Sequence, residues 1–141
     1  MTRTIRIDRT YTHALEKVWH ALTDRDALAV WLMPNDFEPR VGHKFNFRTQ
    51  PMPQFGFDGI VHCEVLECDP PRRLAYSWRG GGLDTVVKFT LEPAADGTRL
   101  RFEHGGFTEP FAVAFERMEH GWQKMLAEGI VAVIARHAPT P

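Results

Sequence analysis

The side chains best suited to chemistry are a histidine, a tyrosine and a cysteine among apolar neighbours. His104 alternates with Leu100 and Phe102 in one segment, and Tyr76 and Cys63 hold equivalent positions in two others. Such alternation turns all three toward the apolar face of a sheet. A histidine there could hydrogen-bond a ligand or exchange a proton near neutral pH. His104 is therefore the candidate for catalysis, although a histidine bonded to backbone or water fits the same pattern.

The two cysteines suggest structure more than chemistry. A thiol becomes a nucleophile when a neighbouring histidine takes its proton. No third side chain in the sequence would orient a Cys63–His104 pair, so a dyad is not predicted. In one extended strand Cys63 and Cys68 would lie about 16 Å apart, too far for a disulfide. We expect small buried thiols in a reducing compartment.

No cofactor or metal site is indicated. Neither cysteine has a cysteine or histidine partner at zinc-ligand spacing. Two histidines of the last helix, His120 and His137, are too far apart to share a metal. The glycines 80–82 lack the following lysine of a phosphate-binding loop.

Composition indicates one globular domain over residues 1–141. The chain is 43% hydrophobic and 25% charged, which is ordinary for such a domain. Its 17 basic and 18 acidic residues give a net charge of -1, so nucleic acid is not an expected partner. No apolar segment reaches the ~20 residues of a membrane span, and the charged N-terminus is unlike a signal peptide. We expect a cytoplasmic protein that does not insert into membranes.

Hydrophobic periodicity predicts the elements that would position these groups. Residues 3–11 alternate as a strand, and residues 13–22 and 24–32 have the spacing of two short helices. Thr12 is a plausible cap for the first helix and Thr23-Asp24 for the second, which ends at Pro34. About six antiparallel strands should follow, over residues 37–40, 44–48, 55–67, 74–79, 87–91 and 99–104.

The last predicted element is one long amphipathic helix, Glu109 to His137. Its apolar positions recur every three or four residues. Aromatic residues and methionines form its first half, and smaller aliphatic residues follow Gly129. We expect the part from Phe115 to Met125 to face a pocket and the part from Ile130 to Ile134 to pack against the core, with Gly129 between them. The element order predicts an α+β fold in which a curved sheet wraps this helix.

The motifs resemble those of the SRPBCC, or START-like, superfamily. Residues 18–24 followed by Leu28-Ala29-Val30-Trp31 are similar to its opening motif. Further similar motifs, in the same order, are Val41-Gly42, residues 59–61 and 69–74, Tyr76-Ser77-Trp78, residues 89–93 and 96–100, Gly105-Gly106-Phe107 and His120-Gly121-Trp122. More narrowly, the chain resembles the branch named for the activator of heat-shock protein 90 ATPase.

The resemblance implies the helix-grip fold and a site. In this fold two short helices follow strand 1, and a long C-terminal helix packs across a curved antiparallel sheet of about six to seven strands. A hollow usually remains between sheet and helix, and aromatic and thioether walls suit a flat or apolar ligand. The residues expected to line it are Trp31, Phe57, Cys63, Tyr76, Trp78, Phe89, Phe102, His104, Phe115, Met118, Trp122 and Met125. A filled core is the other interpretation of the same side chains.

Three functions remain open at this point. The first is binding of an apolar or aromatic small molecule, lipid-like or polyketide-like, for sequestration or transport. The second is an enzyme of the cyclase, dehydrase or hydrolase type that uses His104 in the same cavity. The third, weaker interpretation is a protein-interaction module related to the co-chaperone that activates the heat-shock protein 90 ATPase. An exposed sheet edge or the loop 49–54 could also support a homodimer.

Overall fold

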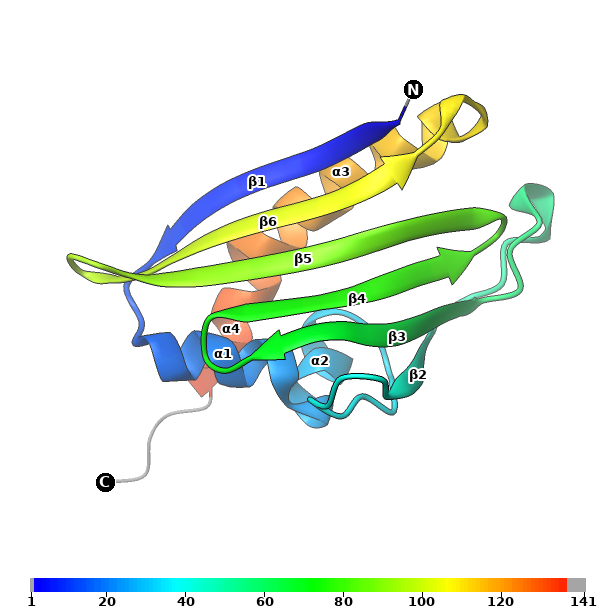
Figure 1. Cartoon of the computed structure of the whole chain (residues 1–141). Coiled ribbons are helices and arrows are strands. Elements are labelled where there is room, and N and C mark those ends of the chain that lie inside the picture. The colour runs from blue at the N-terminus through cyan, green and yellow to red at the C-terminus, as the bar shows by residue number, and fades with distance from the viewer. Residues whose placement is uncertain (1, 137–141) are drawn as a thin grey trace.

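Six antiparallel strands form one curved sheet (Figure 1). The structure, a computed structural model, describes residues 2–136. The strands are β1 Arg3–Tyr11, β2 Lys44–Arg48, β3 Ile60–Asp69, β4 Arg73–Gly80, β5 Leu83–Ala94 and β6 Gly97–Phe107. Their order in the sheet is β1-β6-β5-β4-β3-β2, so β1 and β2 form the two edges.

Helices cover one face of this sheet. They are α1 Leu15–Thr23, α2 Arg25–Trp31, α3 Ala112–Lys124 and α4 Ile130–Arg136, with short 3-10 turns η1 Pro53–Phe55 and η2 Glu109–Phe111. Figure 1 shows α3 and α4 running behind the sheet, with α1 and α2 beside the α4 end. This arrangement confirms the predicted α+β helix-grip fold. The carboxylate of Asp24 accepts a hydrogen bond from the backbone N–H of Ala27 (2.9 Å), which confirms the cap predicted at Thr23-Asp24. The cap predicted at Thr12 is wrong, because Ala14 directly precedes α1 and no side chain caps that helix.

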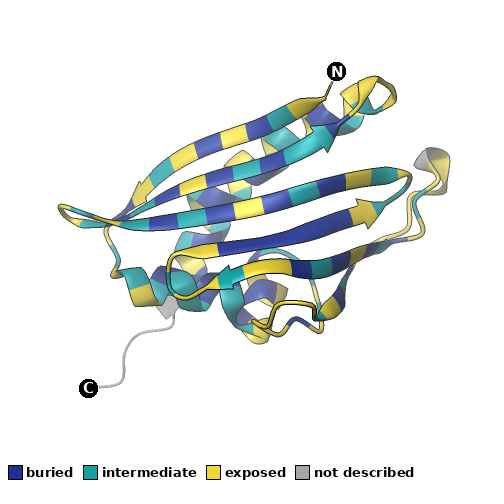
Figure 2. Cartoon of the chain, in the orientation of Figure 1, coloured by how far each residue is buried: buried dark blue, intermediate teal, exposed yellow. Residues whose placement is uncertain are grey.

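The period-two pattern of the strands decides which face the helices cover. Figure 2 shows buried and exposed residues alternating along most strands. The positions predicted to face inward on β3 to β6 are all buried: Val61, Cys63, Val65, Leu74, Tyr76, Trp78, Val87, Phe89, Leu91, Leu100, Phe102 and His104. The outward face carries ion pairs instead, such as Asp8 with Arg99 (2.6 Å). One apolar face therefore remains for the long helix to cover.

Two strand predictions differ from the structure for local reasons. Residues 37–40 form no strand, because the side chain of Asn35 holds this segment as a loop. Its amide donates to the carbonyl of Met33 and accepts from the N–H of Phe37, both at 3.0 Å. The strand predicted to start at residue 55 begins at Ile60. The turn η1 and a bridge between Met52 and Phe57 occupy the preceding segment.

The closing helix continues through a π-helical turn, Met125–Gly129, which joins α3 to α4. The phenol of Tyr11 donates a hydrogen bond to the Leu126 carbonyl within this turn (2.7 Å). Trp31 packs on Gly129, where an added Cβ would lie 3.6 Å from the Trp31 Cβ. The prediction of one long helix thus agrees with the structure, although its first turn is the 3-10 turn η2. Its predicted end at His137 lies outside the described residues.

Two buried tyrosines provide a matched test of this packing. Tyr11→Phe removes the donor to the Leu126 carbonyl and should lower the free energy of unfolding by about 1–2 kcal/mol. Tyr76→Phe removes a fully buried hydroxyl that has no hydrogen-bond partner within residues 2–136. This second change should be neutral or stabilising, because no bond is lost and desolvation of a hydroxyl is avoided. Urea unfolding of both variants checks the difference, and equal losses would contradict it.

Candidate functional site

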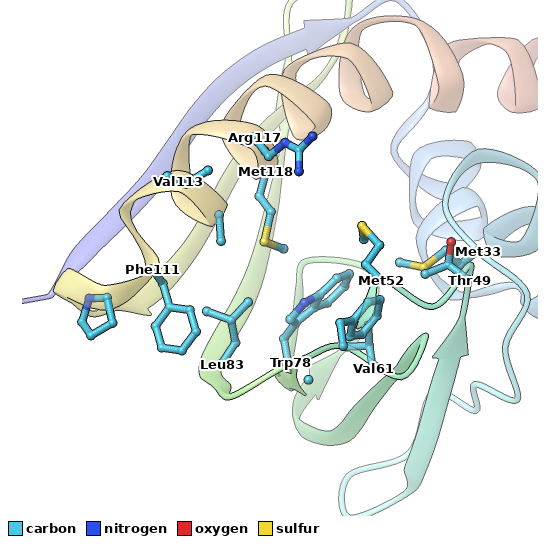
Figure 3. A pocket seen from close by; sticks show the side chains of 15 residues that line it. Met33, Thr49, Met52, Val61, Trp78, Leu83, Phe111, Val113, Arg117 and Met118 are labelled. Atoms are coloured by element: carbon cyan, nitrogen blue, oxygen red, sulfur yellow. The ribbon is translucent and has the colours of Figure 1, made fainter. Parts of the chain in front are cut away.

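A cavity of about 380 Å³ opens at one end of the sheet (Figure 3). Three segments that are distant in the sequence form its walls: the loop before β3, the hairpin between β4 and β5, and the start of the long helix. Its lining residues are Met33, Thr49, Met52, Phe57, Val61, Trp78, Gly80, Gly81, Leu83, Pro110, Phe111, Val113, Ala114, Arg117 and Met118. In Figure 1 these segments meet at the right-hand end of the sheet.

The glycine hairpin lets two aromatic rings close on the backbone. Gly81 and Gly82 have φ of +59° and +86°, where residues with a Cβ are strained. A Cβ added to Gly81 would lie 3.3 Å from the Cβ of Phe57. One added to Gly82 would lie 3.1 Å from the Cζ of Phe111. The hairpin is thus narrow enough for these two rings to stand on either side of it as cavity walls.

The cavity is predominantly apolar. Among its lining side chains, only Thr49, Trp78 and Arg117 carry N–H or O–H groups. Arg117 is exposed, and it is the one charged residue in the lining. Val113 (62% exposed) and Met52 (37% exposed) place apolar surface at the opening. The arrangement suits a compound with a large apolar part and few polar groups.

The structure places only three of the twelve predicted site residues in the lining of this cavity: Phe57, Trp78 and Met118. The other nine lie elsewhere: Trp31, Cys63, Tyr76, Phe89, Phe102, His104, Phe115, Trp122 and Met125. Trp122 occupies the space between helix and sheet, with its ring centroid 4.5 Å from that of Phe102 and 5.6 Å from that of Trp78. Phe115 faces a second hollow of about 220 Å³, and the guanidinium of Arg3 lies 4.1 Å from its ring centroid.

The difference has a simple geometric reason. Periodicity shows which residues of a helix or strand face inward, but not where along the helix the space is filled. Trp122 and its aromatic neighbours fill the middle, so the opening shifts to Phe111, Ala114 and Met118, one turn apart on the same helix face. The remaining lining residues come from strands β3 to β5, from the start of the long helix and from loops. The loop residues have one sequence signal, which is apolar side chains such as Met52 beside prolines and glycines.

His104 is the centre of a buried hydrogen-bond chain. The indole N–H of Trp122 donates to His104 Nδ1 (3.1 Å), and His104 Nε2 lies 2.7 Å from Thr85 Oγ1. The Thr85 hydroxyl in turn donates to the Trp78 carbonyl (2.8 Å). Because Thr85 uses its proton there and Trp122 uses Nδ1, the histidine must carry its proton on Nε2 and donate it to Thr85. Both ring nitrogens are thus occupied by protein groups.

Burial keeps this histidine neutral. His104 has no exposed surface, and desolvation lowers its pKa to about 3. Burial also raises the pKa of the Cys63 thiol, whose hydrogen-bond contact is to the Val61 carbonyl. Within residues 2–136 the two side chains are therefore held in separate contacts. The geometry of His104 is that of a structural residue which ties α3 to β4, β5 and β6.

Metal-binding clusters and membrane-spanning helices are both absent from residues 2–136. No three His, Cys, Asp or Glu side chains gather there in a group that could hold a metal ion. No helix of that range has both the length and the apolar character needed to cross a membrane.

Fold and cavity together define a START-like, SRPBCC domain. The family described as Activator of Hsp90 ATPase homolog 1-like protein matches residues 12–135. The chain belongs to this family. Its predicted resemblance is thereby confirmed over nearly the whole sequence.

Solved structures of similar chains support the assignment. Protein MLL2253 from Mesorhizobium loti is 35% identical, with a TM-score of 0.87 over 97% of this chain and 100% of that chain. BH1534 from Bacillus halodurans is 27% identical, with a TM-score of 0.79 and coverage of 95% and 99%. CalU16 from Micromonospora echinospora is 30% identical, with a TM-score of 0.73 and coverage of 99% and 78%. No curated protein matches the chain.

The buried histidine predicts a pH dependence of stability. Between its ordinary pKa of 6.5 and its folded pKa of about 3, His104 binds a proton in the unfolded chain only. Stability is therefore retained above pH 6.5 and falls as the pH drops through this window. The variant His104→Gln lacks this titration. Its deficit relative to the unmodified protein in free energy of unfolding should shrink by about 2 kcal/mol between pH 7 and pH 5.

Urea unfolding at constant ionic strength measures this difference. The remaining histidines are common to both proteins, so their contributions cancel. Parallel stability profiles between pH 7 and pH 5 would show that His104 titrates alike in the folded and unfolded chains.

Proposed function

We propose that this domain binds an apolar or aromatic small molecule in the cavity beside the glycine hairpin, for sequestration or transport. The observation that carries the proposal is the cavity itself, about 380 Å³ in volume and lined mainly by apolar side chains. Its volume is within the range of about 300–1,000 Å³ of small-molecule sites. Aromatic rings form the walls, and the thioethers of Met33, Met52 and Met118 can adapt to an irregular ligand.

The cavity is supported by a well-packed scaffold. Trp78, one wall, has its ring centroid 5.5 Å from that of Phe47 and 5.6 Å from that of Trp122. A wall held in this way loses little conformational freedom when a ligand binds. The opposite wall comes from the long helix, which the hydrogen bonds of His104 tie to the sheet. Binding therefore requires little rearrangement of the core.

No observation favours an enzyme that acts through His104. Both of its ring nitrogens are bonded to protein groups, and it lies outside the cavity lining. Binding is the function that the cavity supports best.

A fluorescent apolar probe tests the proposal. N-phenyl-1-naphthylamine emits strongly in apolar surroundings and carries no charge. It should bind the protein with one saturable site. The variant Ala114→Trp places an indole into the cavity and should weaken this binding at least about 10-fold, or ~1.4 kcal/mol.

The matched control is Ala29→Trp, at an exposed alanine of α2 outside the cavity lining. This variant should bind the probe as the unmodified protein does. Equal loss in both variants would place the probe site elsewhere, and no saturable binding to the unmodified protein would remove the basis of the proposal.

The natural ligand can then be sought directly. Native mass spectrometry of the protein purified from its own host should show a co-purified small molecule of defined mass. The same molecule should be missing from Ala114→Trp and present in Ala29→Trp. A bound molecule retained equally by both variants would contradict the assignment of the cavity.

A further inference from the structure

One buried tryptophan differs from the other two in its hydrogen bonding. The indole N–H of Trp31 donates to the Ala21 carbonyl (2.7 Å), and that of Trp122 donates to His104 Nδ1 (3.1 Å). Trp78 is equally buried, at 4% exposed, yet its indole N–H has no acceptor within residues 2–136. Buried indole N–H groups normally have a partner, because leaving one unpaired costs free energy.

The unpaired N–H of Trp78 opens to the cavity. Among fully enclosed side-chain nitrogen and oxygen atoms of residues 2–136, only the Tyr76 hydroxyl has no partner. The Trp78 nitrogen is therefore not fully enclosed, and the space that this residue lines is the cavity. Figure 3 shows its indole across the cavity from Leu83 and Met118. Ring contacts with Phe47 and His104, at centroid distances of 5.5 and 5.4 Å, fix its orientation.

Two other polar side chains belong to the lining, and one of them is positively charged. Arg117 extends from α3 at the cavity, and Thr49 lies on the opposite wall (Figure 3). A guanidinium and an indole can only donate hydrogen bonds, and a hydroxyl can do either. No aspartate or glutamate is present in the lining. The cavity thus presents one fixed donor, the Trp78 indole N–H, and the positive charge of Arg117 within apolar walls.

We propose that the ligand is an apolar or aromatic carboxylic acid, bound as its anion, whose carboxylate accepts a hydrogen bond from the Trp78 indole N–H and faces Arg117. The inference rests on the proposed function, since it concerns a ligand of the same cavity. A carboxylate accepts only, so one of its oxygens can accept from the indole N–H while its negative charge lies near the positive guanidinium. An amine would leave the indole N–H unpaired and would be repelled by the guanidinium. A hydrocarbon would leave the N–H buried without a partner.

Three naphthalene derivatives that displace N-phenyl-1-naphthylamine test the assignment. They are 1-naphthoate, 1-naphthamide and 1-naphthylmethylamine, which share one apolar ring system. The first offers a charged acceptor, the second a neutral acceptor with donors, and the third a cation. The unmodified protein should bind 1-naphthoate best and 1-naphthylmethylamine worst.

Two variants separate the two donors. Trp78→Phe should weaken the binding of 1-naphthoate, relative to that of N-phenyl-1-naphthylamine, on the order of 10-fold. Trp78→Phe should also weaken the binding of 1-naphthamide, because the carbonyl of that compound would accept a hydrogen bond from the same N–H. Arg117→Met keeps the aliphatic stem and should weaken 1-naphthoate alone, by about 3-fold, since the guanidinium is exposed and screened.

The outcomes distinguish this inference from the proposed function. If N-phenyl-1-naphthylamine binds but the three derivatives compete equally, the cavity binds apolar compounds and the carboxylate assignment is wrong. If neither the probe nor any derivative binds the unmodified protein, the proposed function itself is wrong. Should Trp78→Phe fail to fold, the order of the three derivatives and the Arg117→Met variant decide the question.

Discussion

The chain of hydrogen bonds through His104 is the constraint on which the rest of this structure depends. It connects Trp122 of the long helix to Thr85 and the Trp78 carbonyl in the sheet, with no exposed histidine surface. Each donor in this chain has one acceptor, so a shift of the helix along the sheet would leave a buried polar group unpaired. The chain therefore sets the position of the helix as well as contributing to stability.

The position of the long helix on the sheet determines where the fold leaves empty space. Trp122 is held over the middle of the sheet, where it packs against Phe89 and Phe102. The interior beneath this part of the helix is filled by rings. The cavity of about 380 Å³ lies where the helix begins, beyond the reach of these side chains. The cavity is thus the part of the interior between helix and sheet that these rings do not fill.

The core and the cavity opening are built from different kinds of structure. The core consists of paired strands and a helix, whereas the cavity opening is made of a glycine hairpin, a loop with two prolines and a 3-10 turn. Loops on a rigid scaffold commonly carry binding surfaces, because they vary without loss of the fold. Trp78 belongs to both parts, since its carbonyl takes part in the core hydrogen bonds and its indole lines the cavity.

Local pattern by itself determined which way side chains face. Period-two alternation predicted that Tyr76, Trp78 and His104 face inward, and helical spacing predicted the inward face of the closing helix. These predictions agree with the structure, because they depend only on backbone geometry within one element. The same local chemistry predicted a helix cap at Thr23-Asp24, where Asp24 provides it.

Tertiary structure alone decided what those inward residues do. His104 meets Trp122 and Thr85 across 18 and 19 residues, and Tyr11 meets Leu126 across 115. A local pattern cannot predict contacts between residues so far apart in the sequence. The sequence therefore indicated His104 only as a candidate site residue, whereas in the structure it joins helix and sheet. The cavity likewise depends on three distant segments meeting. The sequence determined the fold and its inner face, and only packing decided which part of that face stays open.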